Sequence, residues 1–104
     1  MAAVMVYVTC RDEAEAERIA RAALGERLAA CANILGAVRS LYWWQGKLEE
    51  AGEIALLLKT RQDLADKLTA RVRELHSYDV PDISALPIVA GNPDYLAWIA
   101  AETR

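Results

Sequence analysis

Two long apolar segments joined by a short turn constrain the fold of this chain more than any other feature. Residues 31–44 and 50–60 are rich in aliphatic, branched and aromatic residues and are predicted to be β-strands. The stretch "WQGK" between them is typical of a tight turn, in which Gly46 can take a positive φ. Each arm is about twice the usual strand length of roughly five to six residues. A hairpin this long is expected to protrude and to expose an edge unless a neighbouring molecule pairs with it.

Both faces of these strands are apolar. Side chains alternate between the two faces of a strand, so Ile54, Leu56 and Leu58 point one way while Ala55 and Leu57 point the other way. An antiparallel sheet with one solvated face shows polar residues on that face. The chain is 55% hydrophobic in only 104 residues, and a domain this short cannot bury so much apolar surface alone. The sequence therefore predicts a homo-oligomer in which other subunits cover the second face.

The remaining segments complete a βαββαβ order. The predicted elements are a strand at residues 3–9, a helix from Asp12 with Glu15 at capping-box spacing, the hairpin, a helix from a Thr60–Asp63 cap to His76, a strand at residues 83–90, and a short helix opened by Asn92 and Pro93. This order predicts an α+β, ferredoxin-like fold with a four-stranded antiparallel sheet and an extra C-terminal helix. Residues 1–104 are expected to form a single domain.

Composition and charge exclude several classes of protein. The net charge is -3 and there is no Lys/Arg run, so we expect no nucleic-acid or membrane partner. The apolar runs fall short of the roughly 20 residues of a membrane span, and the N-terminus lacks the basic region of a signal peptide. Two cysteines without CxxC spacing fit a reduced, cytoplasmic setting. There is no nucleophile–base pair and no phosphate-cradling glycine loop, so neither an enzyme nor an organic cofactor is predicted.

Cys10 and His76 are the candidate metal ligands. His76 is the only histidine, and its imidazole suits copper or zinc; alternatively it only ends the second helix, where a partial positive charge is favourable. Cys10 lies between the first strand and the first helix, where a helix N-terminus would acidify its thiol; alternatively it is a small buried apolar residue. The residues alone leave both alternatives open.

A candidate cleft is predicted from further polar and aromatic residues. Its members are Glu53, Lys59, Tyr78, Asp82, Asp94 and Trp98. Carboxylates there, with Asp79, could bind a hard cation, but aspartates are also ordinary residues of turns and first helical turns. Tyrosine and tryptophan suit both half-wet clefts and subunit interfaces.

Five motifs in order along the chain carry a resemblance to a known family. They are "ERLAACANI", "SLYWWQGKLEE", "LLLKT", "HSYDVPDISALPI" and "GNPDYLAW". With these motifs the chain resembles the CutA divalent-cation tolerance family. The resemblance implies a homotrimer similar in fold to the PII signalling proteins, and a link to tolerance of copper and other divalent cations.

The resemblance also implies which residues bind metal. Cys10 and His76 match ligands proposed in that family, whereas Leu75, Ser77 and Asp82 depart from its usual pattern. We therefore expect a cytoplasmic homotrimer that binds Cu²⁺ or another divalent cation weakly. The alternative is a PII-like trimeric sensor of a small ligand, or a signalling or scaffold protein, without metal chemistry.

Overall fold

Four strands and three α-helices make up the part of the chain that the structure describes. The computed structural model describes residues 2–104. The elements are β1 (Ala3–Cys10), α1 (Glu13–Gly25), β2 (Cys31–Trp44), β3 (Lys47–Arg61), the 3-10 turn η1 (Gln62–Leu64), α2 (Ala65–Leu75), β4 (Ile83–Ile88) and α3 (Pro93–Glu102). The strands form one antiparallel sheet in the order β2-β3-β1-β4, which confirms the predicted α+β, ferredoxin-like arrangement.

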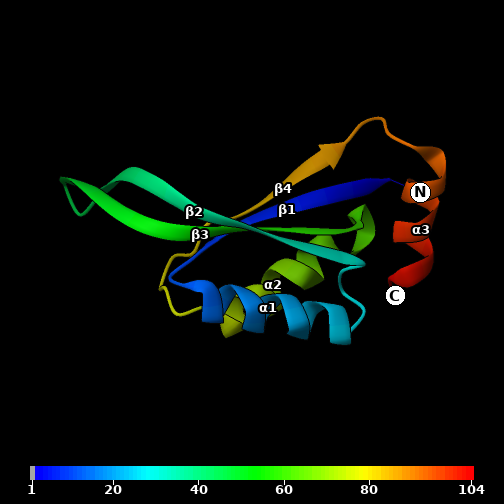
Figure 1. Cartoon of the computed structure of the whole chain (residues 1–104), viewed down its shortest axis with the longest axis horizontal. Coiled ribbons are helices and arrows are strands. Elements are labelled where there is room, and N and C mark those ends of the chain that lie inside the picture. The colour runs from blue at the N-terminus through cyan, green and yellow to red at the C-terminus, as the bar shows by residue number, and fades with distance from the viewer. Residues whose placement is uncertain (1) are drawn as a thin grey trace.

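Helices α1 and α2 lie together against one face of the sheet (Figure 1). Alternate residues of β1 and β3 point into this core, where Val6, Val8, Leu56 and Leu58 are fully buried. The core is completed from the helices by Ile19, Leu68 and Val72.

The opposite face of the sheet is also apolar, as predicted. It carries the intervening residues Met5, Tyr7 and Leu57, which are half-buried, and Leu86, which is exposed. Helix α3 packs at one end of the sheet, near the start of β1 (Figure 1). Between α3 and the hairpin this surface, here called the open face, is accessible in a single chain.

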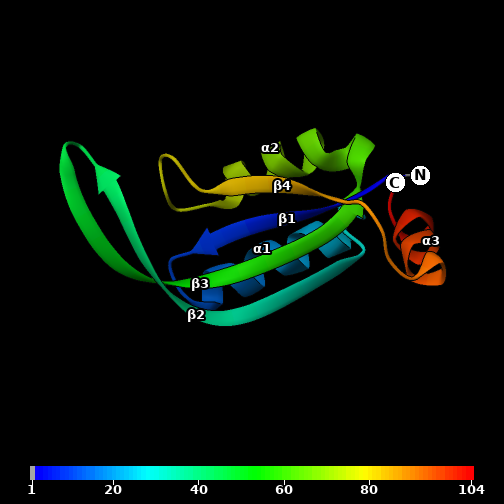
Figure 2. The ribbon, with the colours of Figure 1, turned by 90° about the horizontal axis from the view of Figure 1, so that it is seen from above.

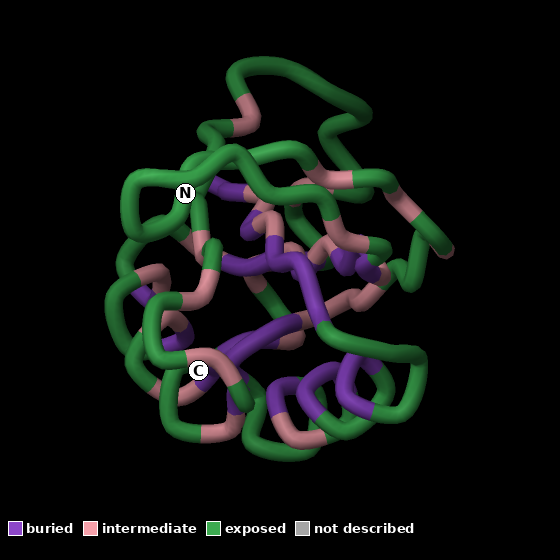
Figure 3. Tube along the Cα trace, turned by 90° about the vertical axis from the view of Figure 1, so that its left-hand side faces the viewer, coloured by how far each residue is buried: buried purple, intermediate pink, exposed green. Residues whose placement is uncertain are grey.

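The β2–β3 hairpin extends well beyond the helices (Figure 2). Gln45 and Gly46 have φ values of 50° and 81°, so they form a two-residue turn that matches the strand twist. Ladder pairing continues to this turn, and β3 therefore begins at Lys47, three residues earlier than predicted. Figure 3 looks onto the hairpin end of the molecule and shows buried residues gathered towards its centre, with exposed chain around them.

Two further predicted boundaries are wrong. Thr60 does not cap α2, because it is still paired in β3 and fully buried, and η1 intervenes before the helix. Strand β4 ends at Ile88 rather than at residue 90, because Ile88 pairs with Ala3, the first residue of β1. By contrast, the predicted caps Asp12 and Asn92 accept hydrogen bonds from Glu15 N and Asp94 N, respectively.

Candidate metal centre

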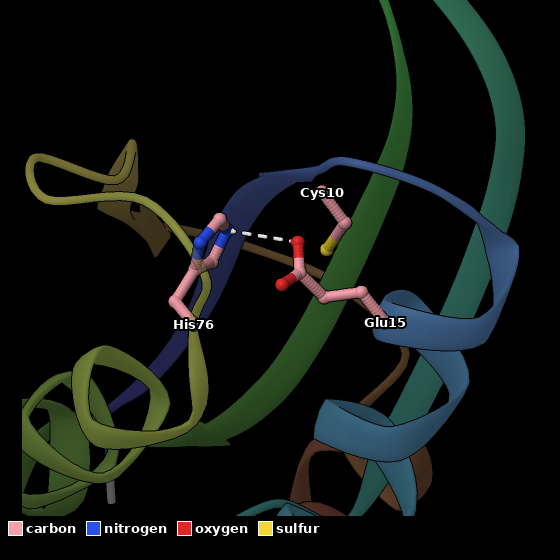
Figure 4. Close-up of side chains that lie close together, drawn as sticks. All are labelled: Cys10, Glu15 and His76. Carbon is pink, nitrogen blue, oxygen red and sulfur yellow. Dashed lines mark ion pairs between the residues drawn. The ribbon is translucent and has the colours of Figure 1, made fainter.

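Three buried side chains from different elements meet at the end of β1. Cys10 is the last residue of β1, Glu15 lies in the first turn of α1, and His76 follows α2 (Figure 4). One potential ligand atom from each lies within 4.8 Å of the others. The side chains of Glu15 and His76 are fully inaccessible, as is Cys10. The structure thus brings together the two residues singled out from the sequence and adds a third, Glu15.

The Glu15 carboxylate is tied to two backbone amides. Asp12 caps the helix by accepting from Glu15 N at 2.8 Å, as the spacing predicts. The Glu15 side chain does not complete that capping box: Oε1 accepts from Arg11 N at 2.8 Å and Oε2 from Ser77 N at 2.9 Å. Burial alone would raise the pKa of Glu15, but these hydrogen bonds outweigh it and hold the pKa below its ordinary value. Glu15 is therefore a buried carboxylate at neutral pH.

Both ring nitrogens of His76 are engaged. Nε2 lies 2.8 Å from the Thr9 carbonyl oxygen and donates to it, while Nδ1 accepts from Tyr78 N at 3.1 Å. These partners select the neutral ring with its proton on Nε2. The dashed line in Figure 4 marks the 3.8 Å between His76 Nε2 and Glu15 Oε1.

The prediction that His76 ends the second helix is confirmed, but its ring does not face the helix end. Helix α2 ends at Leu75, and His76 occupies the C-cap with extended backbone angles. The terminal carbonyl of Leu75 accepts instead from Arg18 Nη2 at 3.0 Å. His76 therefore secures the loop after α2 to the end of β1.

Of the two alternatives for Cys10, the acidified thiol is wrong, and the small buried residue agrees with the structure. Burial, followed by the negative charges of Glu15 and Glu53, raises the pKa of Cys10 to about 12. The start of α1 is nearby, but desolvation and two carboxylates outweigh any effect of the helix dipole. At neutral pH, Cys10 is a buried thiol that must lose a proton to become a strong ligand.

The three types of donor atom suit a borderline divalent cation, but the distances between them are longer than a bound cation would require. Sulfur, imidazole nitrogen and carboxylate oxygen together suit copper or zinc. In a tetrahedral site, metal–ligand bonds of about 2.0–2.3 Å would place the ligand atoms roughly 3.3–3.8 Å from one another. The cluster, whose atoms spread over 4.8 Å, would have to contract by about 1 Å.

The six residues of the candidate cleft divide into two groups. Glu53, Tyr78 and Asp82 line a cavity of about 1020 Å³ between the hairpin and the loop at residues 77–82. Tyr78 Oη donates to Glu53 Oε2 at 3.0 Å. Burial and then this carboxylate raise the pKa of Tyr78 to about 12, so its hydroxyl stays protonated.

The other three cleft residues lie towards α3. Lys59 Nζ is 3.5 Å from Tyr95 Oη, and the Tyr95 ring stacks on Trp98 at 5.5 Å between centroids. Asp94 is an exposed residue in the first turn of α3. Glu53 and Lys59 are six positions apart on one strand, which separates them by roughly 20 Å. Within one chain, the structure does not bring the two groups together.

The fold and the cluster define a class: a ferredoxin-like α+β protein with a buried Cys–Glu–His group at the end of its first strand. The sequence model described as "CutA1 divalent ion tolerance protein" matches residues 4–102. The chain belongs to the CutA1 divalent ion tolerance family.

Individual relatives agree with this assignment. The chain is 46% identical over 101 residues to the divalent-cation tolerance protein CutA of Pyrococcus horikoshii, covering 97% of this chain and 98% of that one. It is 45% identical to the chloroplastic protein CutA 1 of rice, again over 97% of this chain, but it spans only 57% of the rice protein. The solved divalent cation tolerance protein of Thermus thermophilus superposes with a TM-score of 0.95 at 45% identity, covering 98% of this chain and 99% of that chain.

None of the helices formed by residues 2–104 is both long enough and apolar enough to cross a membrane.

Proposed function

We propose that this chain binds a divalent cation at Cys10, Glu15 and His76 as part of a metal tolerance response. The cation is copper or another ion with a similar preference for sulfur and nitrogen ligands. The observation that carries the proposal is the convergence of three buried donor groups within 4.8 Å in a member of a divalent ion tolerance family. A bound cation would add positive charge between the Cys10 thiol and the Glu15 carboxylate, which otherwise has, among residues 2–104, only the Arg18 guanidinium, 3.6 Å from its Oε2, as a cationic partner. We further propose that the protein works as a cytoplasmic homotrimer, which the apolar open face and the protruding hairpin favour.

Cation binding at this cluster is expected to be weak, because each donor is already committed. Cys10 must release its proton, and Glu15 holds the amides of Arg11 and Ser77. His76 can offer Nε2 only by giving up its bond to Thr9 O. A neutral ring would then carry its proton on Nδ1, where it would face the Tyr78 amide. The loop at residues 77–82 must therefore adjust when His76 becomes a ligand.

Calorimetric titration of variants tests the assignment. Cys10→Ser and His76→Ala should each weaken binding of Cu²⁺ and Zn²⁺ by about tenfold or more, because each removes a ligand. Cys31→Ser is the matched control, since Cys31 is the other free cysteine and lies at the start of β2 outside the cluster. Wild-type affinity in both cluster variants would rule the site out.

The affinity should also rise with pH. The pKa of Cys10 is about 12, so near neutral pH a cation must displace the thiol proton. If one proton is released, the apparent affinity for Zn²⁺ should increase by about tenfold per pH unit, after correction for metal hydrolysis. Titrations at two pH values in buffers of different ionisation enthalpy measure the proton count. A pH-independent affinity with no proton release would contradict ligation by Cys10.

A second candidate function, sensing of a small organic ligand, is favoured by the cavity beside the hairpin. Its volume of about 1020 Å³ and its mixture of aromatic and acidic lining residues are typical of a ligand site. This function does not require metal at the Cys10 cluster.

A further inference from the structure

The Arg18 side chain joins the end of α2 to the buried carboxylate of the proposed cation site. Arg18 follows Glu15 by one helical turn in α1. Its Nη2 donates to the Leu75 carbonyl oxygen at 3.0 Å and lies 3.6 Å from Glu15 Oε2. The Arg18 side chain is 51% exposed, whereas that of Glu15 is fully buried. The guanidinium is therefore a half-exposed positive charge in contact with a buried negative one.

Arg18 acts on Glu15 through its charge rather than through a hydrogen bond. The two carboxylate oxygens already accept from Arg11 N at 2.8 Å and from Ser77 N at 2.9 Å. The 3.6 Å between Arg18 Nη2 and Glu15 Oε2 is too long for a hydrogen bond, but it is short for an interaction between opposite charges.

The charge of Arg18 also reaches the sulfur of Cys10. Burial raises the pKa of Cys10 to about 12, and the carboxylates of Glu15 and Glu53 add to this increase, whereas Arg18 opposes it. The field of the guanidinium therefore extends over two of the three proposed ligands.

Arg18 is the positive charge that a cation entering the cluster would meet. Within residues 2–104, it is the one lysine or arginine side chain at ion-pair distance from the Glu15 carboxylate. The Arg11 side chain is closer in sequence to Cys10, but it bonds to Asp12 at 3.3 Å. A guanidinium has no acceptor atom and cannot bind the cation itself. Its effect on a bound cation is therefore repulsive.

This repulsion depends on the charge of the cation. The interaction of a fixed charge with an ion is proportional to the charge of that ion. Whether or not the thiol loses its proton, a divalent cation adds one more positive charge to the cluster than a univalent cation does. The exposed half of Arg18 allows solvent and salt to screen the interaction, so we expect a moderate effect.

We propose that Arg18 is a specificity-determining residue of the cation site, whose guanidinium disfavours divalent cations relative to univalent cations with the same preference for sulfur and nitrogen ligands. The inference rests on the proposed binding of cations at Cys10, Glu15 and His76. It assigns to Arg18 a part of the weakness expected for divalent cations. Univalent ions of the soft class, such as Ag⁺, are the natural comparison, because thiolate ligands suit them.

The ratio of Zn²⁺ affinity to Ag⁺ affinity tests the proposal. Both ions are titrated against competing chelators in chloride-free buffer, and every protein carries Cys31→Ser, so that Cys10 is the one thiol in the chain. Arg18→Gln should raise the ratio by about threefold to tenfold, because it removes the charge. Arg18→Lys keeps the charge and should leave the ratio within about twofold of its parent value. An unchanged ratio in Arg18→Gln would overturn the proposal.

Arg21→Gln is the matched control. Arg21 lies one turn further along α1, is exposed, and pairs with Glu17 at 2.8 Å, so the substitution removes the same charge away from the cluster. The ratio should not change in this variant, and a change as large as in Arg18→Gln would show that the position of Arg18 has no special role. Loss of the bond from Arg18 to Leu75 O would alter both affinities in the same proportion, so a purely structural role of Arg18 does not move the ratio.

Failure of the proposed cation site would give a different result. Zn²⁺ affinity that is insensitive to Cys10→Ser would overturn both the site and the role of Arg18. Zn²⁺ binding that depends on Cys10, combined with an unchanged ratio in Arg18→Gln, would overturn the role of Arg18 alone.

Discussion

Replacement of Leu57 by Asp should dissociate the protein into monomers or unfold it. Leu57 lies on the open face, between Leu56 and Leu58, which point into the helix-covered core. In the proposed homotrimer the open face is buried between subunits, so the substitution would place one unpaired carboxylate per subunit in an apolar interface. Each buried charge of this kind costs several kcal/mol, with an effective penalty of about 3–5 kcal/mol when no partner is present.

Sedimentation equilibrium at micromolar concentration, with circular dichroism as a check on folding, measures this effect. Wild type should sediment as a trimer. Leu24→Asp is the control, because Leu24 is a 37%-exposed leucine near the end of α1, on the opposite layer of the molecule. A well-folded wild-type monomer, or a Leu57→Asp variant that remains a trimer, would show that the open face is not the subunit interface.

Glu15→Gln should lower the free energy of unfolding by about 2–4 kcal/mol. Glu15 accepts from the amides of Arg11 and Ser77, and it is fully buried. The amide of Gln carries only one acceptor oxygen, so one backbone N–H would face an NH₂ group. A buried donor left unsatisfied costs about 1–3 kcal/mol, and hydrogen bonds to a charged group contribute about 1.5–3 kcal/mol.

The Glu15 contribution should depend on pH in a defined direction. Its folded-state pKa lies below the ordinary value of 4.5, so the native state favours the ionised form. The stabilisation is therefore complete above that value and is lost as the pH falls through the lowered pKa. Urea unfolding of wild type and Glu15→Gln at equal protein concentration should give a large difference near neutral pH and a smaller one at about pH 3.

Glu17→Gln provides the matched control for this experiment. Glu17 lies two residues further along α1 and is exposed, and its one ion pair within residues 2–104 is with Arg21 at 2.8 Å. Surface pairs of this type contribute about 0–1 kcal/mol. A Glu15 variant as stable as this control, or a difference that does not change with pH, would contradict the role of the buried carboxylate.

Local signals in the sequence predicted most of the fold. The Gln45–Gly46 turn, the Asp12 cap and the Asn92–Pro93 helix start each depend on a few neighbouring residues, and each is found in the structure. The start of α2 was missed because Thr60 resembles a helix cap in sequence but is buried in a paired strand. Burial depends on the whole sheet, so no local pattern around Thr60 could reveal it.

The candidate site was predicted less completely, because its chemistry depends on distant contacts. Cys10 and His76 were singled out, but Glu15 was interpreted only as part of a capping box. Its carboxylate reaches Ser77, 62 residues away, and spacing along the helix gives no sign of that contact. For Cys10 the sequence left an acidified thiol and a small buried residue as alternatives, and the acidified thiol is wrong, since burial and the carboxylates of Glu15 and Glu53 outweigh the helix end. The rise per residue along a strand could by itself have shown that Glu53 and Lys59, six positions apart, are too distant to line one cleft.

An anomalous-scattering map of crystals soaked in copper tests the proposed metal centre most directly. We expect a peak within about 2.0–2.3 Å of Cys10 Sγ and of a His76 ring nitrogen, with the Glu15 carboxylate adjacent and the Tyr78 amide displaced from the ring. Copper found only at surface positions, with the bonds from His76 to Thr9 and Tyr78 still intact, would contradict the assignment of this cluster as the cation site.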